Sequence, residues 1–366
     1  MGRKKRRTVY SGIGGQAVLE GVMMKNSEKY AVAVRKPDGE IEVDIDNYQG
    51  VLHGNKFKEI PFIRGMFNFV DSMKLGTKCL NYSADFYEEE EAKETVVDKA
   101  LNKISGGKSE KILNSLVVFV AIALAVGLFI LLPYFLTAQF EQYIENHSLV
   151  LIIEGAIRIV IFLLYVVGIA VMDDIRRLYM YHGAEHKCIN CIERGKPLTV
   201  NNVMRSSRIH RRCGTSFMFL VMFVSIILFF FIRVENPVYR IGLRVLLIPV
   251  IAGISYEIIR LAGRSNNFLV TLISLPGLML QRMTTKEPTR DMVKVAIASV
   301  EAVFDWKEFL MENFEYTAEQ LAEYEDETPA DEDSEDVLEE KQEDSKADDF
   351  VSEEPEQDAF VKEEEL

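Results

Sequence analysis

Long runs of apolar residues in the middle of the chain constrain its fold more than any other feature. Four of them are long or apolar enough to be considered as membrane spans: Ile112–Ala138, Leu149–Met172, Ser216–Ile232 and Ile241–Ile259. The first carries no charged residue, and the second carries one glutamate and one arginine. A helix needs about 20 predominantly apolar residues to cross the hydrocarbon layer of a bilayer. We therefore predict an α-helical multi-pass membrane protein with about four spans, which excludes a wholly soluble protein.

A fifth apolar run, Asn267–Leu280, is shorter and contains Pro276 followed by Gly277. Its length of about 14 residues falls below that of a spanning helix. A re-entrant or interfacial segment therefore suits this run better, and a fifth crossing is the alternative.

Lysine and arginine are distributed unevenly between the connections. The connection 139–148 has none, whereas the connection 173–215 has nine. Because cytoplasmic loops retain an excess of positive residues, we expect the loop 173–215 and both termini on the cytoplasmic side. The chain starts with a basic cluster, Arg3–Arg7, that no apolar stretch follows, so we expect no signal peptide.

Three folded regions follow from these patterns. Residues 1–110 carry a hairpin signal around Lys36–Gly39 and an amphipathic helix that begins near Pro61, which together predict a small cytoplasmic α+β domain. Residues 111–282 form the predicted membrane domain. Residues 283–318 read as an amphipathic helical segment, which would pack on the N-terminal domain and cap the cytoplasmic face.

The tail, residues 319–366, has 23 acidic residues against three lysines, a balance of −20 in a chain whose formal charge is −14. The negative net charge of the chain therefore comes from its tail. Residues 1–318 are mildly basic, with a formal net charge of +6. Such a composition predicts disorder. The tail could bind basic protein partners or act as solubilising charge, and no direct nucleic-acid motif is present.

The residues that point to chemistry begin in the cytoplasmic loop. His182 and His186 are four residues apart, so on a helix they lie one turn apart on the same face and can bind one metal ion. Glu185 completes a histidine–glutamate–histidine order that is typical of one class of zinc metalloproteases, in which it would act as general base. Three of the five histidines fall within residues 182–210.

A second group of possible ligands follows at the membrane face. His210 and Cys213 lie where the chain enters the third predicted span, and Glu257 lies near the cytoplasmic end of the fourth. With the two loop histidines they form a suitable ligand set for a divalent transition metal, most naturally zinc. The alternative is a set of interfacial or capping histidines that bind no metal.

The remaining unusual residues favour structural roles. Four cysteines fit a reducing compartment, and Cys188 and Cys191 fall on the helix face opposite His182, which predicts ordinary packing. Glu154 and Arg158 are four residues apart inside the second predicted span. Charges at that depth must be paired, so we predict an ion pair that faces the bundle. A polar pathway or a lipid-headgroup site is the alternative.

Five separated motifs occur in order along the chain: Gly14–Met24, Tyr181–Lys187, His210–Phe217, Gly253–Glu257 and Pro276–Gln281. Together they resemble the YqhQ-like family of bacterial multi-pass membrane proteins. The resemblance runs from about Ser11 to Val303 and does not include the acidic tail. Arg211 stands where the family more often has proline, beside a possible ligand rather than at one.

The resemblance implies a protein of the bacterial cytoplasmic membrane, in a family of unknown function whose members are regarded as predicted metal-dependent enzymes. By match of motif it indicates these positions for metal binding: His182, His186, His210, Cys213 and Glu257. Glu185 is a further position to test. Glu20 and Gln16, in the first motif, could hold the metal ligands in place through hydrogen bonds, or serve as a general base.

Three functions remain open on the sequence. In the first, the protein is a metal-dependent hydrolase that acts at the cytoplasmic membrane face on lipid-linked or membrane-proximal substrates. In the second, the metal or polar cluster is structural, and the protein is a non-enzymatic assembly or scaffolding factor that helps membrane protein insertion, translocation or membrane-bound ribosomes. In the third, the charged pair marks a transport route, which no internal repeat supports.

Overall fold

The computed structural model describes residues 8–87 and 109–324, except for residues 55, 142, 145, 211–212, 233, 235, 263–267 and 323. The chain divides into two compact units, residues 1–316 and 317–366. The described part of the second unit contains one short helix, α15 (Ala318–Ala322). Residues 325–366, most of the tail for which we predict disorder, lie outside the described residues.

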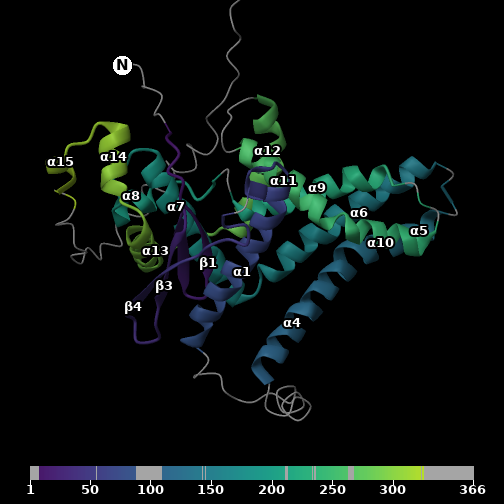
Figure 1. The fold of residues 1–366 in the computed structure, drawn as a ribbon, viewed down its shortest axis with the longest axis horizontal. Coiled ribbons are helices and arrows are strands. Elements are labelled where there is room, and N and C mark those ends of the chain that lie inside the picture. The colour runs from purple at the N-terminus through teal and green to yellow at the C-terminus, as the bar shows by residue number, and fades with distance from the viewer. Residues whose placement is uncertain are drawn as a thin grey trace, which may run out of the picture. The chain divides into compact units, whose positions relative to one another are not determined.

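The first unit contains a four-stranded antiparallel sheet in which each strand pairs with the next along the chain (Figure 1). Its strands are β1 (Gly14–Val18), β2 (Gly21–Asn26), β3 (Lys29–Arg35) and β4 (Ile41–Asn47). β3 and β4 form the hairpin predicted around Lys36–Gly39, and the pair Arg35–Ile41 closes it. The β1–β2 hairpin was not predicted, because Gly14 and Gly15 have little strand propensity.

In the described part of the chain, the helices that pack most extensively on this sheet are α1 (Ile63–Asp85), α7 (Asp173–Glu193) and α13 (Arg290–Val303). α7 contacts β1 and β2, α13 contacts β2, β3 and β4, and α1 contacts β1 and β3. The hydroxyl of Ser299 on α13 donates to the carbonyl of Ala31 on β3 at 3.2 Å. α13 is thus the amphipathic helix expected after the membrane domain. The short helices η1 (Lys56–Glu59), α8 (Val200–Met204) and α14 (Trp306–Phe314) lie in the same unit.

The apolar runs form helices. They are α4 (Ser109–Val126), a π-helical turn η2 (Gly127–Leu131), α5 (Leu132–Glu141), α6 (His147–Ile169), α9 (Gly214–Phe230), α10 (Pro237–Leu246), α11 (Ile248–Ala262) and α12 (Phe268–Thr284). Among the described residues, three stretches are long and apolar enough to cross a membrane: Val118–Phe140, Ser148–Ile169 and Val238–Leu261.

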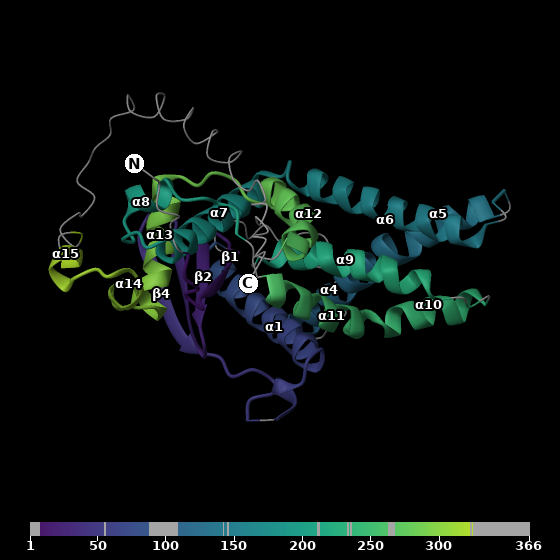
Figure 2. The same cartoon turned by 90° about the horizontal axis from the view of Figure 1, so that it is seen from above.

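The other two apolar runs differ in length from these three stretches. α9, which corresponds to the third predicted span, is apolar but has only 17 residues. The fifth run is a helix, α12, that continues through Pro276 and also has 17 residues. α9 packs against α6, α11 and α12. α1 packs against both the sheet and α11 (Figure 2), and a Cβ at Gly65 would lie 3.0 Å from the Cα of Gly253, so glycine is needed at this contact.

Three charged side chains are buried between the apolar helices. The Arg158 guanidinium donates to Glu154 at 2.7 Å on α6, which confirms the predicted pair. Arg244 of α10, which was not predicted to join this pair, donates to both oxygens of the same carboxylate at 2.7 and 2.9 Å. Arg158 also donates to the carbonyl of Phe129 at 2.9 Å, inside η2, where a π-helical turn leaves a carbonyl free for it. The cluster ties η2, α6 and α10 together.

Candidate metal centre

Helix α7 supplies two of the site's side chains. Asp173 and Asp174 in its first turn favour the helix start, and Gly195, with φ of 70°, follows its end. From Tyr181 onward nearly every residue is buried, because the sheet and α13 pack on one side and the loop after α8 on the other. His182 and His186 lie one turn apart on this buried section.

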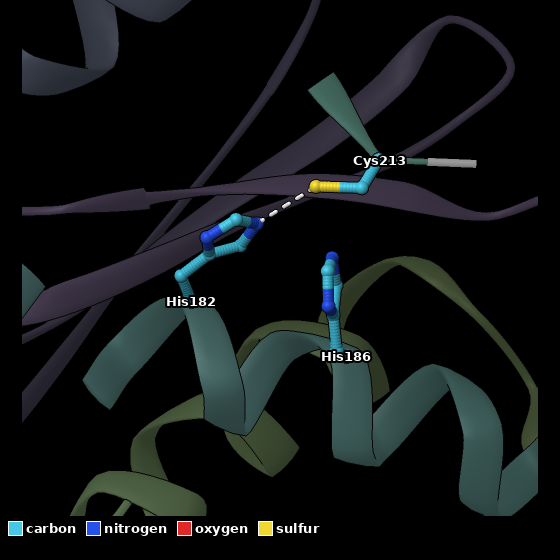
Figure 3. A group of neighbouring side chains, drawn as sticks. All are labelled: His182, His186 and Cys213. Atoms are coloured by element: carbon cyan, nitrogen blue, oxygen red, sulfur yellow. Dashed lines mark hydrogen bonds between the residues drawn. The ribbon is translucent and has the colours of Figure 1, made fainter. Parts of the chain in front are cut away.

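The two histidines meet Cys213, the residue that caps the N-terminus of α9. His182, His186 and Cys213 each offer one ligand atom, and these atoms all lie within 4.8 Å of one another. His182 Nε2 is 3.1 Å from Cys213 Sγ, and the two imidazole rings are 4.4 Å apart between centroids. Figure 3 shows both rings rising from α7 toward the sulfur. Two histidines and one cysteine are a ligand set that suits zinc or a similar transition metal.

Backbone carbonyls fix the orientation of both rings. His182 Nδ1 lies 3.0 Å from the carbonyl oxygen of Thr284, at the end of α12, and His186 Nδ1 lies 2.6 Å from the carbonyl oxygen of Arg208. A carbonyl can only accept, so each Nδ1 carries the proton and donates. Each Nε2 points away from its carbonyl and can bind a metal ion through its lone pair when it carries no proton. Metal-binding histidines are typically oriented in this way.

The electrostatic environment favours the thiolate form of Cys213. Burial raises the pKa of this thiol, but His182 and His186 beside it lower the pKa more, to well below its ordinary value. Burial lowers the pKa of His182, while the neighbouring sulfur of Cys213 and the carboxyl of Glu185 raise it to about 9. The thiolate is the form of cysteine that binds metals. Cys213 is therefore prepared for coordination.

Glu185 lies on the same helix and faces strand β1. Its side chain is buried, which raises the pKa of the carboxyl, while the nearby His186, His182 and backbone of Gly15 act to lower that pKa. A Cβ at Gly15 would lie 2.6 Å from the carbonyl oxygen of Met23 and 3.0 Å from Cγ of Glu185. Glycine at this position therefore lets β1 approach α7 and hold the carboxyl next to the histidines.

His210 lies beside the group of three but has other partners. Its ring centroid is 5.7 Å from that of His186, and its Nε2 is 3.5 Å from Glu193 on α7. The side chain of Gln281 binds its backbone, accepting from the His210 N–H at 3.0 Å and donating to the carbonyl at 2.7 Å. Gln281 was not among the predicted site residues, although it ends the last of the five motifs.

The other two predicted positions lie in ion pairs elsewhere. Glu257 accepts from Arg64 of α1 at 2.7 and 2.5 Å, so the structure does not bring it to the histidines. Glu20, in the turn between β1 and β2, pairs with Arg177 of α7 and accepts from the hydroxyl of Tyr181 at 3.2 Å. Each carboxylate thus forms an ion pair with an arginine of another element: Glu257 connects α11 to α1, and Glu20 connects the β1–β2 turn to α7.

Cys188 and Cys191 are not among the three grouped ligand residues. Both thiols are buried on the opposite face of α7, where Cys191 Sγ lies 3.4 Å from the carbonyl oxygen of Pro197. Burial raises the pKa of both thiols, that of Cys191 to about 11. A protonated, packed thiol is a poor metal ligand.

Comparisons with known proteins agree with the motifs. Residues 60–306 match the family described as "Protein of unknown function (DUF1385)". The chain is 34% identical over 287 residues to the uncharacterized protein YqhQ of Bacillus subtilis (strain 168), which covers 78% of this chain and 90% of that protein. No solved structure matches the chain. The family match contains His182, His186 and Cys213, and it confirms the resemblance to YqhQ: the chain belongs to the DUF1385 family.

Proposed function

We propose that this protein is a membrane protein that binds one divalent transition metal ion, with zinc the best fit, through His182, His186 and Cys213. One observation carries the proposal: three atoms suited to zinc lie within 4.8 Å of one another, and carbonyls hold both rings with Nε2 toward the sulfur. Softer ligands such as thiolate and imidazole select zinc over magnesium or calcium.

Two observations support a membrane protein: the three long apolar stretches and the large apolar side chains exposed on their surfaces. Large apolar side chains on these helices face outward: Leu124 is 68% exposed, Leu164 66% and Leu246 73%. Exposed apolar surface of this extent suits contact with lipid acyl chains. In our proposal α9 is a fourth span, α12 is a re-entrant or interfacial segment, and both termini and the metal centre lie on the cytoplasmic side of the bacterial inner membrane.

The activity that this donor set supports best is metal-assisted hydrolysis. Three protein ligands leave the fourth tetrahedral position open, and an ion bound there would supply Lewis-acid chemistry. Glu185 has the carboxyl nearest to the ligands in the sequence, and its raised pKa suits a group that exchanges a proton with water or substrate. The substrate would be a lipid-linked or membrane-proximal molecule that reaches the cytoplasmic face.

A structural metal is the second candidate, and burial favours it. His186 is 1% exposed and Cys213 4% exposed, and a large cavity beside the sheet is lined by none of the three ligands. In that case the protein is an assembly or scaffolding factor whose ion joins α7 to α9. Partners in membrane protein insertion, or basic partners of the acidic tail, would then carry the function.

Metal content and water access together separate these functions. Protein purified in detergent without chelator should contain about one zinc per chain, and His182→Ala should lose it while the exposed-histidine control His53→Ala keeps it. The same protein can be prepared with cobalt in place of zinc. If the fourth coordination position is open, added azide or thiocyanate should bind to the cobalt ion and change its absorption spectrum. An unchanged spectrum would support a structural metal. Absence of metal from every preparation would contradict both the catalytic and the structural metal.

A further inference from the structure

A cavity of about 640 Å³ lies between the β1–β2 hairpin, α1, the segment 48–53 and Tyr256 of α11. This volume can enclose a small organic ligand. Tyr256 belongs to the apolar stretch Val238–Leu261 and lies near its end. In a membrane-inserted protein the cavity would therefore lie at the level of the lipid headgroups. It is separate from the metal centre, whose three ligands do not line it.

Lys25 is the charged group that makes this cavity unusual. Its side chain is partly buried, and its ammonium lies 5.0 Å from the ring centroid of Tyr48. Within residues 8–87 and the described parts of 109–324, this ammonium has no hydrogen bond and no ion pair. A partly desolvated ammonium that has an aromatic ring beside it but no hydrogen-bond acceptor is costly, so an anionic ligand would be favoured there.

The two carboxylates of the cavity are already bound by other donors. Asp71 accepts from the hydroxyl of Tyr48 at 3.0 Å and from the backbone N–H of Val51 at 2.9 Å. Glu28 lies 3.2 Å from Nδ1 of His53. Neither carboxylate forms a hydrogen bond with the ammonium of Lys25. Burial lowers the pKa of Lys25, and the nearby charges of Asp71 and Glu28 only partly offset this effect.

Further donors face the same space. The side-chain amide of Asn68 donates to the hydroxyl oxygen of Tyr256 at 2.8 Å, so the Tyr256 proton is left to donate. The hydroxyl of Ser72 and the side chain of Gln16 also line the cavity. Several groups that line the cavity can therefore donate a hydrogen bond to a ligand.

We propose that this cavity binds a phosphate-bearing polar group whose oxygens accept from Lys25 Nζ and from the Tyr256 hydroxyl. Lysine binds phosphate as a point charge, and a charge-assisted hydrogen bond is stronger than a neutral one. The group is either the headgroup of a phospholipid or a soluble phosphate ester. Metal binding is not required, because the cavity and the ligands of the metal centre are separate.

The test compares two probes on the full-length protein in detergent, by isothermal titration calorimetry. Dihexanoyl phosphatidic acid represents the lipid, and glycerol 3-phosphate represents the soluble ester. We expect at least one probe to bind, and Lys25→Met to weaken that binding at least tenfold. Lys29→Met, which removes an exposed lysine at the start of β3, is the matched control and should bind as the wild type does. Tyr256→Phe should weaken binding severalfold, which keeps the test valid if Lys25→Met does not fold.

The outcomes distinguish the two sources of phosphate. Binding of the lipid probe alone assigns a phospholipid, binding of glycerol 3-phosphate alone assigns a soluble ester, and binding of both supports the shared chemistry. Binding of neither probe, or equal binding by wild type, Lys25→Met and Tyr256→Phe, overturns the proposal. Protein treated with a chelator should bind equally well, so failure of the metal proposal would leave this result unchanged.

Discussion

His182 and Cys213 are 31 residues apart in the chain, and the Nε2 and Sγ atoms of their side chains lie 3.1 Å apart. This contact joins helix α7, which packs on the sheet, to the N-cap of the apolar helix α9. The carbonyl of Thr284 on α12 orients the same imidazole. Three elements therefore converge at one pair of atoms, and a metal ion there would connect the sheet side of the unit to its apolar helices.

Glu257→Gln should leave metal content unchanged. In the structure this carboxylate binds Arg64, and the pair joins α1 to α11. Loss of a partly exposed ion pair should lower the free energy of unfolding by about 1 kcal/mol. Zinc analysis and thermal unfolding of the same preparation measure both effects. Loss of metal from Glu257→Gln would restore Glu257 as a ligand and contradict the geometry.

Glu154→Gln should destabilise the apolar helices strongly. It removes the only negative charge of the buried Glu154–Arg158–Arg244 cluster among the described residues and leaves two buried cations without a counter-charge. Breaking a buried pair in this way costs about 3–5 kcal/mol. Arg282→Met, which removes an exposed arginine, serves as the control. Equal unfolding temperatures for the two variants in detergent would show that the cluster adds little to stability.

Stability should fall at alkaline pH, in part through Cys79. Burial raises the pKa of this thiol to about 11, while a thiol in the unfolded chain titrates near pH 8.5. Between these values the folded protein keeps a proton that the unfolded chain has lost, so unfolding becomes easier as pH rises, by about 1.4 kcal/mol per pH unit. The difference in melting temperature between wild type and Cys79→Ala should therefore narrow from pH 8 to pH 10.5. Parallel curves would contradict the raised pKa.

Gly15→Ala should disturb the contact between β1 and α7. The added Cβ would lie 3.0 Å from Cγ of Glu185 on α7 and 2.6 Å from the carbonyl oxygen of Met23 on β2, and overpacking of this kind costs about 1–3 kcal/mol. Gly14→Ala is a matched control, because a Cβ there meets no atom within 4 Å. We expect reduced stability and weaker zinc binding for Gly15→Ala only, measured by thermal unfolding and by competition with a zinc-binding dye. Equal stability and equal zinc affinity of the two variants would show that β1 does not support the metal centre.

Local spacing was sufficient to predict the histidine pair. Residues four apart on a helix share a face whatever surrounds them, so His182 and His186 could be placed together from the sequence. The order of the spans brought Cys213 to the same side. The ion pair Glu154–Arg158 was predictable for the same local reason.

Partners from distant elements were not predictable in this way. Nothing in the sequence around Glu257 shows that α1 places Arg64 beside it, and nothing around Glu154 shows that Arg244 lies at the same depth. The sequence also could not predict that the carbonyl of Thr284 orients His182, because every residue has a carbonyl and no residue type marks this one. Long-range pairing, rather than local spacing, decides these contacts.

The absorption spectrum of the cobalt-substituted protein tests the central claim most directly. Cobalt(II) takes the tetrahedral geometry of zinc, and a bound thiolate adds an intense ultraviolet charge-transfer band. We predict this band in the wild type at about one cobalt per chain, its loss in Cys213→Ser, and its persistence in the Cys191→Ala control. A wild-type protein that binds no cobalt, or a Cys213→Ser variant that keeps the band, would contradict a metal centre formed by His182, His186 and Cys213.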